Sequence, residues 1–154
     1  MIDLAIKHLI KEEGIRLIPY PDSEGYWTLG IGHLIDCRKG GSIPPGVHCF
    51  PISEQLARQI LVDDIHKVHT DLSMNLSYWS SLSKVRQVCL TSMAFQMGIE
   101  GLMGFKQTLF YIKWFRYQDA AVEMLDSDWA REDTPSRAKR ISMAMGTDRE
   151  DHLV

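Results

Sequence analysis

Three polar residues near the N-terminus have the types and the spacing that hydrolytic chemistry needs. Glu13 and Asp22 carry carboxyl groups and Thr28 carries a hydroxyl, all within one short stretch of the chain. Cleavage of a glycosidic bond requires an acid that protonates the leaving oxygen and a second carboxylate that activates water or stabilises the developing cation. Each residue also has an ordinary structural explanation, since an aspartate in a turn usually bonds its own backbone. Together they are candidates for one hydrolytic site.

Three different elements are predicted to hold these side chains. An amphipathic run indicates a helix over residues 3–13, and Gly14 is the residue type that ends helices in a left-handed conformation. Turn-forming residues follow at 19–25, and residues 27–31 are rich in strand formers. The glutamate is therefore expected at a helix end, the aspartate in a turn and the threonine on a strand.

The same stretch follows the pattern E-G-x-x-L-x-x-Y-x-D-x-x-G-x-x-T-x-G-x-G-H and resembles the T4-type phage lysozymes, glycoside hydrolase family 24. Further matches at 95–98 and 134–140 extend the resemblance over nearly the whole chain. It implies an α+β, mostly α fold, in which a small antiparallel sheet lobe and a helical lobe are joined by a long helix with the active-site cleft between them. The motif positions matched here are Glu13, Gly14, Leu17, Tyr20, Asp22, Gly25, Thr28, Gly30, Gly32 and His33.

The resemblance also implies a role for individual side chains. Glu13 is expected to be the general acid, with Asp22 and Thr28 positioning the attacking water. Gln96 matches a position that lines the cleft and bonds the sugar, although a satisfied polar residue at a helix end is the alternative. The substrate-contacting positions expected from the resemblance are Gln96, Phe95 and Leu34.

Three further residues are expected to support the site. His33 matches the family histidine that pairs with an acid on the connecting helix, and Asp64 is the matching position, with Asp63 as the alternative. Arg137 matches the arginine that the family places near the catalytic glutamate. No third ligand stands at a suitable spacing for a metal ion. We therefore expect a structural histidine–aspartate pair and neither a metal nor a cofactor.

The first half of the chain beyond the motif is predicted to contain a sheet, a loop and a long helix. Residues 20–35 are expected to form the small antiparallel sheet, with residues 22–25 turning between its strands. Residues 36–46 are too rich in glycine and proline for regular structure. Ser53 is the expected N-cap of a helix that runs to about residue 74. By resemblance this is the helix that joins the lobes.

The second half of the chain is predicted to be helical throughout. The helix that starts after Ser83 is expected to end at Gly98, and two more helices are expected at 105–117 and 119–125. Thr134 is predicted to cap a last helix that has Pro135 at its first position. The lobes implied are a sheet lobe at 14–52, a connecting helix at 53–74 and a helical lobe made of 75–154 with 1–13.

Composition favours an ordinary globular protein. The chain has 154 residues, of which 45% are hydrophobic and 24% charged, so its size indicates a single domain. The net charge of −3 argues against a nucleic-acid partner, which would favour a basic face. No apolar run approaches the length that spans a bilayer. We therefore expect no stable membrane insertion, and the resemblance implies a monomer that binds peptidoglycan glycan strands.

The N-terminus and the cysteines bear on where the protein works. Charged residues interrupt the first thirteen positions, so a signal peptide's apolar core is absent there. Three cysteines without C-x-x-C spacing indicate free thiols, although pairing of Cys37 with Cys49 after export stays open. The resemblance implies an endolysin that waits in the host cytoplasm. It would act in the periplasm once a separate holin-like pore opens the membrane.

The sequence therefore predicts a lysozyme that hydrolyses the β-1,4 bond between N-acetylmuramic acid and N-acetylglucosamine. The alternative is a peptidoglycan- or chitin-binding module that has kept the cleft but lost catalysis. The complete set of Glu13, Asp22 and Thr28 favours the enzyme.

Overall fold

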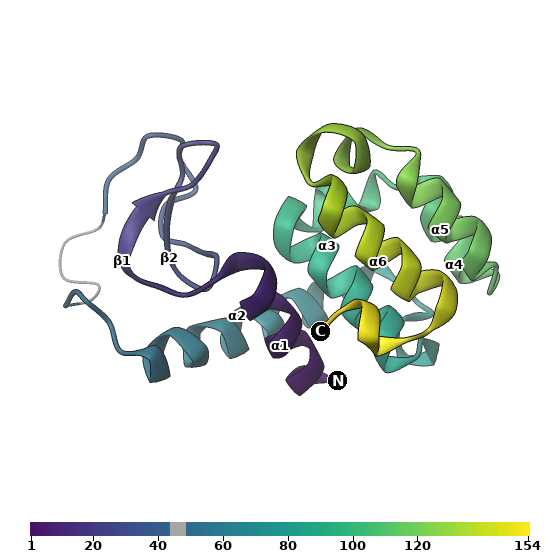
Figure 1. Ribbon diagram of the computed structural model, residues 1–154, viewed down its shortest axis with the longest axis horizontal. Coiled ribbons are helices and arrows are strands. Elements are labelled where there is room, and N and C mark those ends of the chain that lie inside the picture. The colour runs from purple at the N-terminus through teal and green to yellow at the C-terminus, as the bar shows by residue number, and fades with distance from the viewer. Residues whose placement is uncertain (44–48) are drawn as a thin grey trace. The chain divides into compact units, whose positions relative to one another are not determined.

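The computed structural model describes residues 1–43 and 49–154, which form mostly helices and one small antiparallel sheet (Figure 1). The α+β, mostly α class predicted from the sequence is confirmed. Short 3-10 or π turns also occur at Trp79–Ser81, Trp129–Asp133 and Glu150–His152. The helices and strands are α1 (Ile2–Glu13), β1 (Arg16–Pro21), β2 (Trp27–Gly30), β3 (His33–Leu34), α2 (Glu54–Asn75), α3 (Lys84–Met103), α4 (Lys106–Lys113), α5 (Tyr117–Leu125) and α6 (Pro135–Thr147).

The chain divides into two compact units. The sheet unit is Leu9–His66, and the helical unit combines Met1–His8 with Lys67–Val154. Both division points lie within helices, because α1 begins in the helical unit and ends in the sheet unit, whereas α2 does the reverse. The lobe boundaries expected from the sequence stay a prediction.

The sheet unit is built on three antiparallel strands in the order β1-β2-β3. Strand β1 runs from Arg16 to Pro21, so the sheet starts earlier than predicted and residues 19–21 belong to a strand, whereas the turn predicted at residues 22–25 is confirmed. Proline lacks a backbone N–H and is tolerated in a strand at a sheet edge, which is where β1 lies. The actual turn starts at Asp22, whose N–H and carbonyl bond Tyr26 and Gly25.

One face of the sheet is covered by the start of α2. Leu29 on β2 is fully buried against Ile52 and Ala57. Ser53 caps α2 as predicted, because its hydroxyl accepts the Leu56 N–H at 3.1 Å. Since successive strand residues point to opposite faces, Leu29 turns inward and its neighbour Thr28 faces the other side of the sheet. The partly buried residues packed on this core are Ile15, Leu17, Ile35, Leu56 and Ile60.

A clamped loop follows β3. Residues 36–43 have no helix or strand, as predicted, and positions 44–46 of the predicted loop lie outside the described residues. The Asp36 carboxylate accepts the Arg38 N–H at 2.9 Å, two guanidinium N–H groups of Arg38, and the Ser42 N–H at 3.2 Å. These bonds hold the pKa of Asp36 at about 2, below its ordinary value.

The helical unit packs α3 to α6 together (Figure 1). The break predicted at Gly98 is present inside α3, where this residue has φ 74° and ψ 166°. Helix α4 ends at Lys113, earlier than predicted, and Phe115 in the following connection has φ 59°. Thr134 precedes Pro135 as predicted, but its hydroxyl does not cap α6 and instead contacts the Gln96 side chain.

A buried polar chain ties the ends of the helical unit together. His8 Nδ1 donates to the Leu153 carbonyl at 2.9 Å, so in the neutral ring Nε2 accepts from the Ser92 hydroxyl at 2.8 Å. The Arg137 guanidinium donates to the Ser92 Oγ at 3.0 Å and to its carbonyl oxygen at 3.3 Å. Because buried polar groups must be hydrogen-bonded, this chain fixes four segments of the unit against one another.

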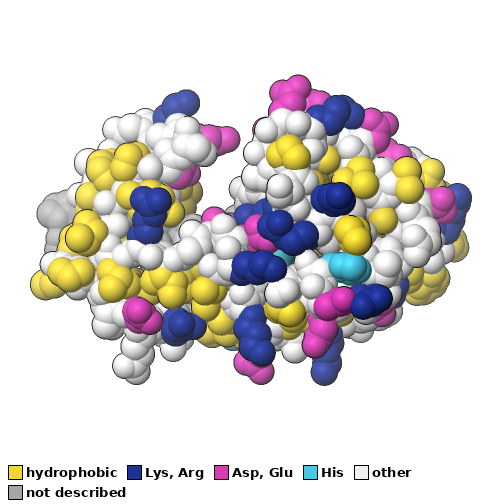
Figure 2. All heavy atoms as spheres, in the orientation of Figure 1, with side chains coloured by type: hydrophobic (Ala, Val, Ile, Leu, Met, Phe, Trp, Pro, Cys, Tyr) yellow, Lys and Arg dark blue, Asp and Glu magenta, His cyan; other side chains and the backbone are white. Residues whose placement is uncertain are grey.

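Charges of both signs occur on the surface, and the three cysteines are free thiols. Basic and acidic side chains are interspersed on the face that Figure 2 shows. Cys37 and Cys49 are exposed free thiols and Cys89 is buried, where burial raises the pKa of its thiol. In the described part of the chain, no single helix is long and apolar enough to cross a membrane, and only α3 and α4 taken together, bent by 99°, pass that test.

Candidate active site

Glu13 occupies the last position of α1. Gly14 ends the helix with φ 69° and donates its N–H to the Ile10 carbonyl at 2.9 Å, which is a left-handed helix cap. A residue with a side chain rarely adopts this φ, so the glycine sets where the helix stops. The Glu13 side chain is half-buried in the sheet unit and is therefore positioned by a rigid helix end.

Asp22 is held in a fixed orientation by its own turn. The N–H groups of Glu24 and Tyr26 both donate to Asp22 Oδ1, at 2.9 and 2.8 Å. Among the described residues, none hydrogen-bonds to Oδ2 of this half-buried carboxylate. One oxygen is thus committed to the backbone, and the second is left to accept a hydrogen bond from water or a ligand.

Thr28 is linked to the aspartate through the backbone of a single residue, Tyr26. The Thr28 hydroxyl, which belongs to a side chain only 4% exposed, donates to the Tyr26 carbonyl at 3.2 Å. The same carbonyl accepts the Asp22 N–H at 2.8 Å, while the Tyr26 N–H donates to the Asp22 carboxylate. Because its proton is directed at the carbonyl, the hydroxyl oxygen offers lone pairs as an acceptor.

The strand register places further side chains beside Thr28. Tyr20 on β1 and Leu34 on β3 are its direct cross-strand partners, and cross-strand partners share a face of a sheet. Leu34 is 46% exposed, so the predicted sugar-contacting residue lies at the surface next to the predicted water-positioning one. The face opposite Leu29 thus carries a row of Tyr20, Thr28 and Leu34.

The environment of Tyr20 shows that both candidate carboxylates lie near one point. Burial and the negative charges of Glu13 and Asp22 raise the pKa of the Tyr20 phenol, with the Arg16 guanidinium acting in the opposite direction. Arg16 Cζ lies 4.4 Å from the centre of the Tyr20 ring, a cation–π contact. The phenol therefore stays protonated well above neutral pH and can donate a hydrogen bond in this neighbourhood.

His33 and Asp64 form the pair that the resemblance implied. His33 Nδ1 donates to Asp64 Oδ2 at 2.6 Å, and the alternative acid, Asp63, accepts instead from Gln59. The pair connects β3 to α2 within the sheet unit. In the described ranges, no group of three or more acidic, histidine or cysteine side chains is arranged to hold a metal ion.

The remaining predicted site residues belong to the helical unit. Gln96 Oε1 accepts the Trp129 indole N–H at 3.0 Å, and its amide nitrogen donates to the Thr134 hydroxyl at 3.1 Å. Both ends of this amide are thus engaged within the unit. Arg137 is 6% exposed and bonds Ser92, and Phe95 is half-buried on α3. The sugar-binding roles of Gln96 and Phe95, and the role of Arg137 beside the acid, stay predictions.

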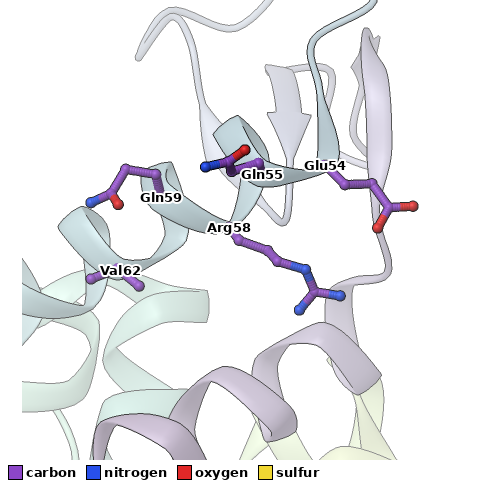
Figure 3. Close-up of a pocket in the computed structure, with 5 residues that line it drawn as sticks. All are labelled: Glu54, Gln55, Arg58, Gln59 and Val62. Atoms are coloured by element: carbon purple, nitrogen blue, oxygen red, sulfur yellow. The ribbon is translucent and has the colours of Figure 1, made fainter.

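A surface groove elsewhere on the sheet unit is distinct from these groups. Its lining comes entirely from the first half of α2, and Figure 3 shows the long side chains of Arg58 and Gln59 projecting from that helix. None of the candidate catalytic residues lines it. The groove is lined by Glu54, Gln55, Arg58, Gln59 and Val62.

Sequence reasoning missed the part that the backbone plays in this site. Tyr26 connects Asp22 to Thr28 through its peptide N–H and carbonyl, which any residue type could supply, so no side-chain signal marks it. Tyr20 was matched in the motif without a role. A correct prediction of the pairing between β1 and β2 would have placed Tyr20 directly opposite Thr28.

Comparisons with known proteins agree on one family. A sequence model of the family described as phage lysozyme matches residues 10–140. The chain is 30% identical to "Probable T4-type lysozyme 1" of Dictyostelium discoideum, over 93% of this chain and 94% of that protein. It is 29% identical to "Probable T4-type lysozyme 2" of the same organism, over 89% and 91%. It is also 29% identical to "Pre-baseplate central spike protein Gp5" of Enterobacteria phage T4, over 90% of this chain and 27% of that protein.

Proposed function

Because the chain belongs to the phage lysozyme family and is thus a glycoside hydrolase of the muramidase type that acts on peptidoglycan, we propose that Glu13, Asp22 and Thr28 are its catalytic residues. The bond cleaved is the β-1,4 linkage between N-acetylmuramic acid and N-acetylglucosamine. No cofactor takes part in this chemistry.

Glu13 acts as the general acid. It donates its proton to the glycosidic oxygen as the bond to the sugar breaks, which lets the leaving sugar depart as a neutral alcohol. Its position at a helix end held by Gly14 supports this role, since an acid must keep a fixed orientation toward the leaving oxygen. The proximity of its charge to Tyr20 supports a shared neighbourhood with Asp22.

Asp22 and Thr28 position the attacking water. A water that bridges Asp22 Oδ2 and Thr28 Oγ1 would donate one hydrogen to each, because the carboxylate and the hydroxyl oxygen both act as acceptors. Its lone pairs would then be directed away from both groups and toward the sugar. Deprotonation by the carboxylate as the oxygen attacks completes hydrolysis with inversion at the anomeric carbon.

The single observation that carries the proposal is that the backbone N–H and carbonyl of Tyr26 connect these two groups. The carbonyl accepts from the Thr28 hydroxyl and from the Asp22 N–H, and the N–H donates to the Asp22 carboxylate, at 3.2, 2.8 and 2.8 Å. Two acceptors are thereby oriented before any substrate arrives. Such preorganisation is what lowers the cost of holding a water in the reactive position.

In its biological setting we assign the protein to host-cell lysis as an endolysin. It would accumulate as a monomer in the host cytoplasm and reach the periplasmic wall after a separate holin-like pore permeabilises the inner membrane. The interspersed surface charges support binding by specific contacts with the glycan rather than by bulk electrostatic attraction (Figure 2).

The first test is the substitution Glu13→Gln, with Glu12→Gln as a matched control at the adjacent position. Removing the acid while keeping its shape should lower the clearing rate of permeabilised Gram-negative cells by roughly 10²-fold or more. Circular dichroism should be unchanged for both variants, and Glu12→Gln should clear cells at close to the wild-type rate. Near wild-type clearing by folded Glu13→Gln would remove this residue from the mechanism.

A second assay, on purified sacculi, separates the enzyme from a binding module. If the wild-type protein binds purified sacculi but releases no reducing sugar ends, the chain has kept recognition and lost catalysis. The complete set of oriented acceptors at Asp22 and Thr28 favours release of new reducing ends.

A further inference from the structure

One exposed surface of the helical unit combines aromatic and cationic side chains, and we call it the α4 aromatic surface. Phe110, Trp114 and Phe115 are 50, 60 and 65% exposed. Lys106 and Lys113 lie in the same segment and are exposed as well. Large apolar side chains that gather at one place on a protein surface mark an interaction site, whereas single ones need no explanation.

The period of α4 brings these groups to one side of the helix. Lys106, Phe110 and Trp114 follow one another at intervals of four residues, the spacing of neighbours on a helix face. The other side of the helix is anchored in the core of the unit. The residues buried there are Thr108, Leu109 and Ile112.

Neighbouring rings support the exposed ones. Phe110 meets Tyr111 edge-on with ring centres 6.0 Å apart, and Phe115 meets Tyr117 in the same way at 6.3 Å. The Arg116 guanidinium lies 4.7 Å from the centre of the Tyr111 ring. The aromatic groups on both sides of the α4–α5 connection are therefore held by contacts with half-buried tyrosines and are not isolated side chains.

Phe115 adopts a backbone conformation that an ordinary side chain avoids. Its φ of 59° lies in the left-handed region, which is unfavourable for a residue other than glycine. A ring that is 65% exposed recovers little of this cost by burial in its own chain. The position would suit glycine or asparagine, so a phenylalanine with an exposed ring there is consistent with a contact made outside the protein.

The charge of the segment is opposite to that of the chain as a whole. The net charge of the protein is −3, yet residues 101–118 contain three basic side chains and no acidic one. Arg116 is paired with Asp119 at 2.7 Å. Within the described part of the chain, Lys106 and Lys113 have no ion-pair partner. The two lysine ammonium groups are thus available to bind an anionic partner beside the exposed aromatic rings.

We propose that the α4 aromatic surface docks on an anionic phospholipid bilayer, with α4 lying along the membrane surface. Aromatic rings favour the boundary between headgroups and acyl chains, and lysines beside them reach the lipid phosphates. Helix α4 has 8 residues and is too short to span a bilayer, so the contact is peripheral.

The test measures binding of the full chain to vesicles of phosphatidylglycerol and of phosphatidylcholine by co-sedimentation. The wild-type protein should partition onto phosphatidylglycerol about tenfold more strongly than onto phosphatidylcholine. The triple variant Phe110→Ser/Trp114→Ser/Phe115→Gly should lose about tenfold of this binding. Glycine suits the backbone at 115, so folding is expected to be retained, which circular dichroism checks. Ile18→Ser, which changes a 62% exposed side chain in the sheet unit, should bind as wild type.

Two further variants test the charge and the geometry. Lys106→Gln/Lys113→Gln should bind both vesicle types equally, because it removes the available cations while keeping the rings. Brominated phosphatidylglycerol should quench the tryptophan fluorescence of the wild-type protein. The quenching should disappear in Trp114→Phe, which keeps the other three of the four tryptophans of the chain. Persistent quenching in this variant would place the membrane contact elsewhere and overturn the proposal.

The proposal is independent of the glycosidase mechanism. Glu13→Gln should bind phosphatidylglycerol vesicles as the wild-type protein does, so loss of lysis and loss of lipid docking are distinguished. A folded triple variant with unchanged vesicle binding would contradict the lipid assignment. The lipid assignment would also be contradicted if the wild-type protein does not bind the vesicles and the triple variant loses binding to purified sacculi. The surface would then recognise glycan.

Discussion

At the scale of single residues, the Asp22 carboxylate is held in place by its own turn. Its Oδ1 is committed to two backbone N–H groups, which leaves Oδ2 as the oxygen that can act on a water. A direct nucleophile would have no use for the Thr28 hydroxyl, whereas a bound water gains a second partner from it. The geometry therefore favours an inverting mechanism over attack by the carboxylate itself.

This choice between mechanisms predicts the configuration of the first product. Inversion of a β-1,4 linkage releases an α anomer, and proton NMR of fresh product reports it before mutarotation sets in. Asp22→Ala should lower kcat by roughly 10²-fold or more, because the group that accepts the proton of the water is lost. Thr28→Ala should cost less, since the carboxylate still holds the water. A β anomer appearing first would exclude the role of Asp22 in positioning water.

The candidate residues of the site could be named from the sequence because their types and spacing match a dense motif, and their catalytic roles stay predictions. The hydrogen bonds that connect these residues could not be predicted from the sequence. The bonds of Tyr26 to Asp22 and Thr28 are made by its peptide groups, and every residue type carries those groups. The engagement of Gln96 by Trp129 likewise depends on a contact 33 positions apart in sequence, which helix periodicity does not report.

At the scale of elements, the loop after β3 depends on one carboxylate. Asp36 is 9% exposed and gathers the Arg38 side chain together with backbone N–H groups of the loop. Gly41 approaches it so closely that an added Cβ would lie 2.2 Å from Asp36 Oδ2. The clamp therefore needs both the ionised carboxylate and a residue without a side chain at 41.

The lowered pKa of Asp36 predicts an acid-dependent loss of stability. The carboxyl has a folded-state pKa of about 2, below its ordinary value of 3.8, so its contribution is present above pH 4 and is lost as the pH falls toward 2. Asp36→Asn should lower Tm by a few degrees at pH 7 and converge with wild type near pH 2.

Gly41→Ala provides a companion variant that leaves the charge unchanged. It should lower Tm at neutral pH because the methyl group displaces the carboxylate from its partners. Thermal unfolding of all three proteins across pH 2–7 checks both statements. A gap between wild type and Asp36→Asn that does not narrow in acid would contradict the linkage.

Element boundaries were predicted best where a local sequence signal marks them. Ser53 and the turn signals gave the start of α2, and Gly98 gave the break in α3. Strand β1 was placed too late because Pro19 and Pro21 were taken as turn residues, although an edge strand tolerates both. The Thr134 hydroxyl was expected to cap α6, but it instead accepts a hydrogen bond from the Gln96 side chain. Local propensity does not report such competition.

At the scale of the whole molecule, the proposed lysis function predicts behaviour inside a host. Expressed alone in the cytoplasm, the protein should not lyse Gram-negative cells until the inner membrane is breached, for example by chloroform. The reason is that its substrate lies on the far side of that membrane. Cell turbidity before and after permeabilisation measures this, with Glu13→Gln as the inactive control. Lysis without permeabilisation, or recovery of the protein in the periplasm, would contradict the endolysin assignment.

The bond between His8 and the Leu153 carbonyl also bears on synthesis. It joins residues 145 positions apart, so residue 153 must leave the ribosome before the helical unit can close. The sheet unit, Leu9–His66, is complete in the nascent chain long before that moment. Translation therefore imposes an order: the unit that carries both candidate carboxylates can assemble on the ribosome, while the unit formed from the two ends of the chain must wait.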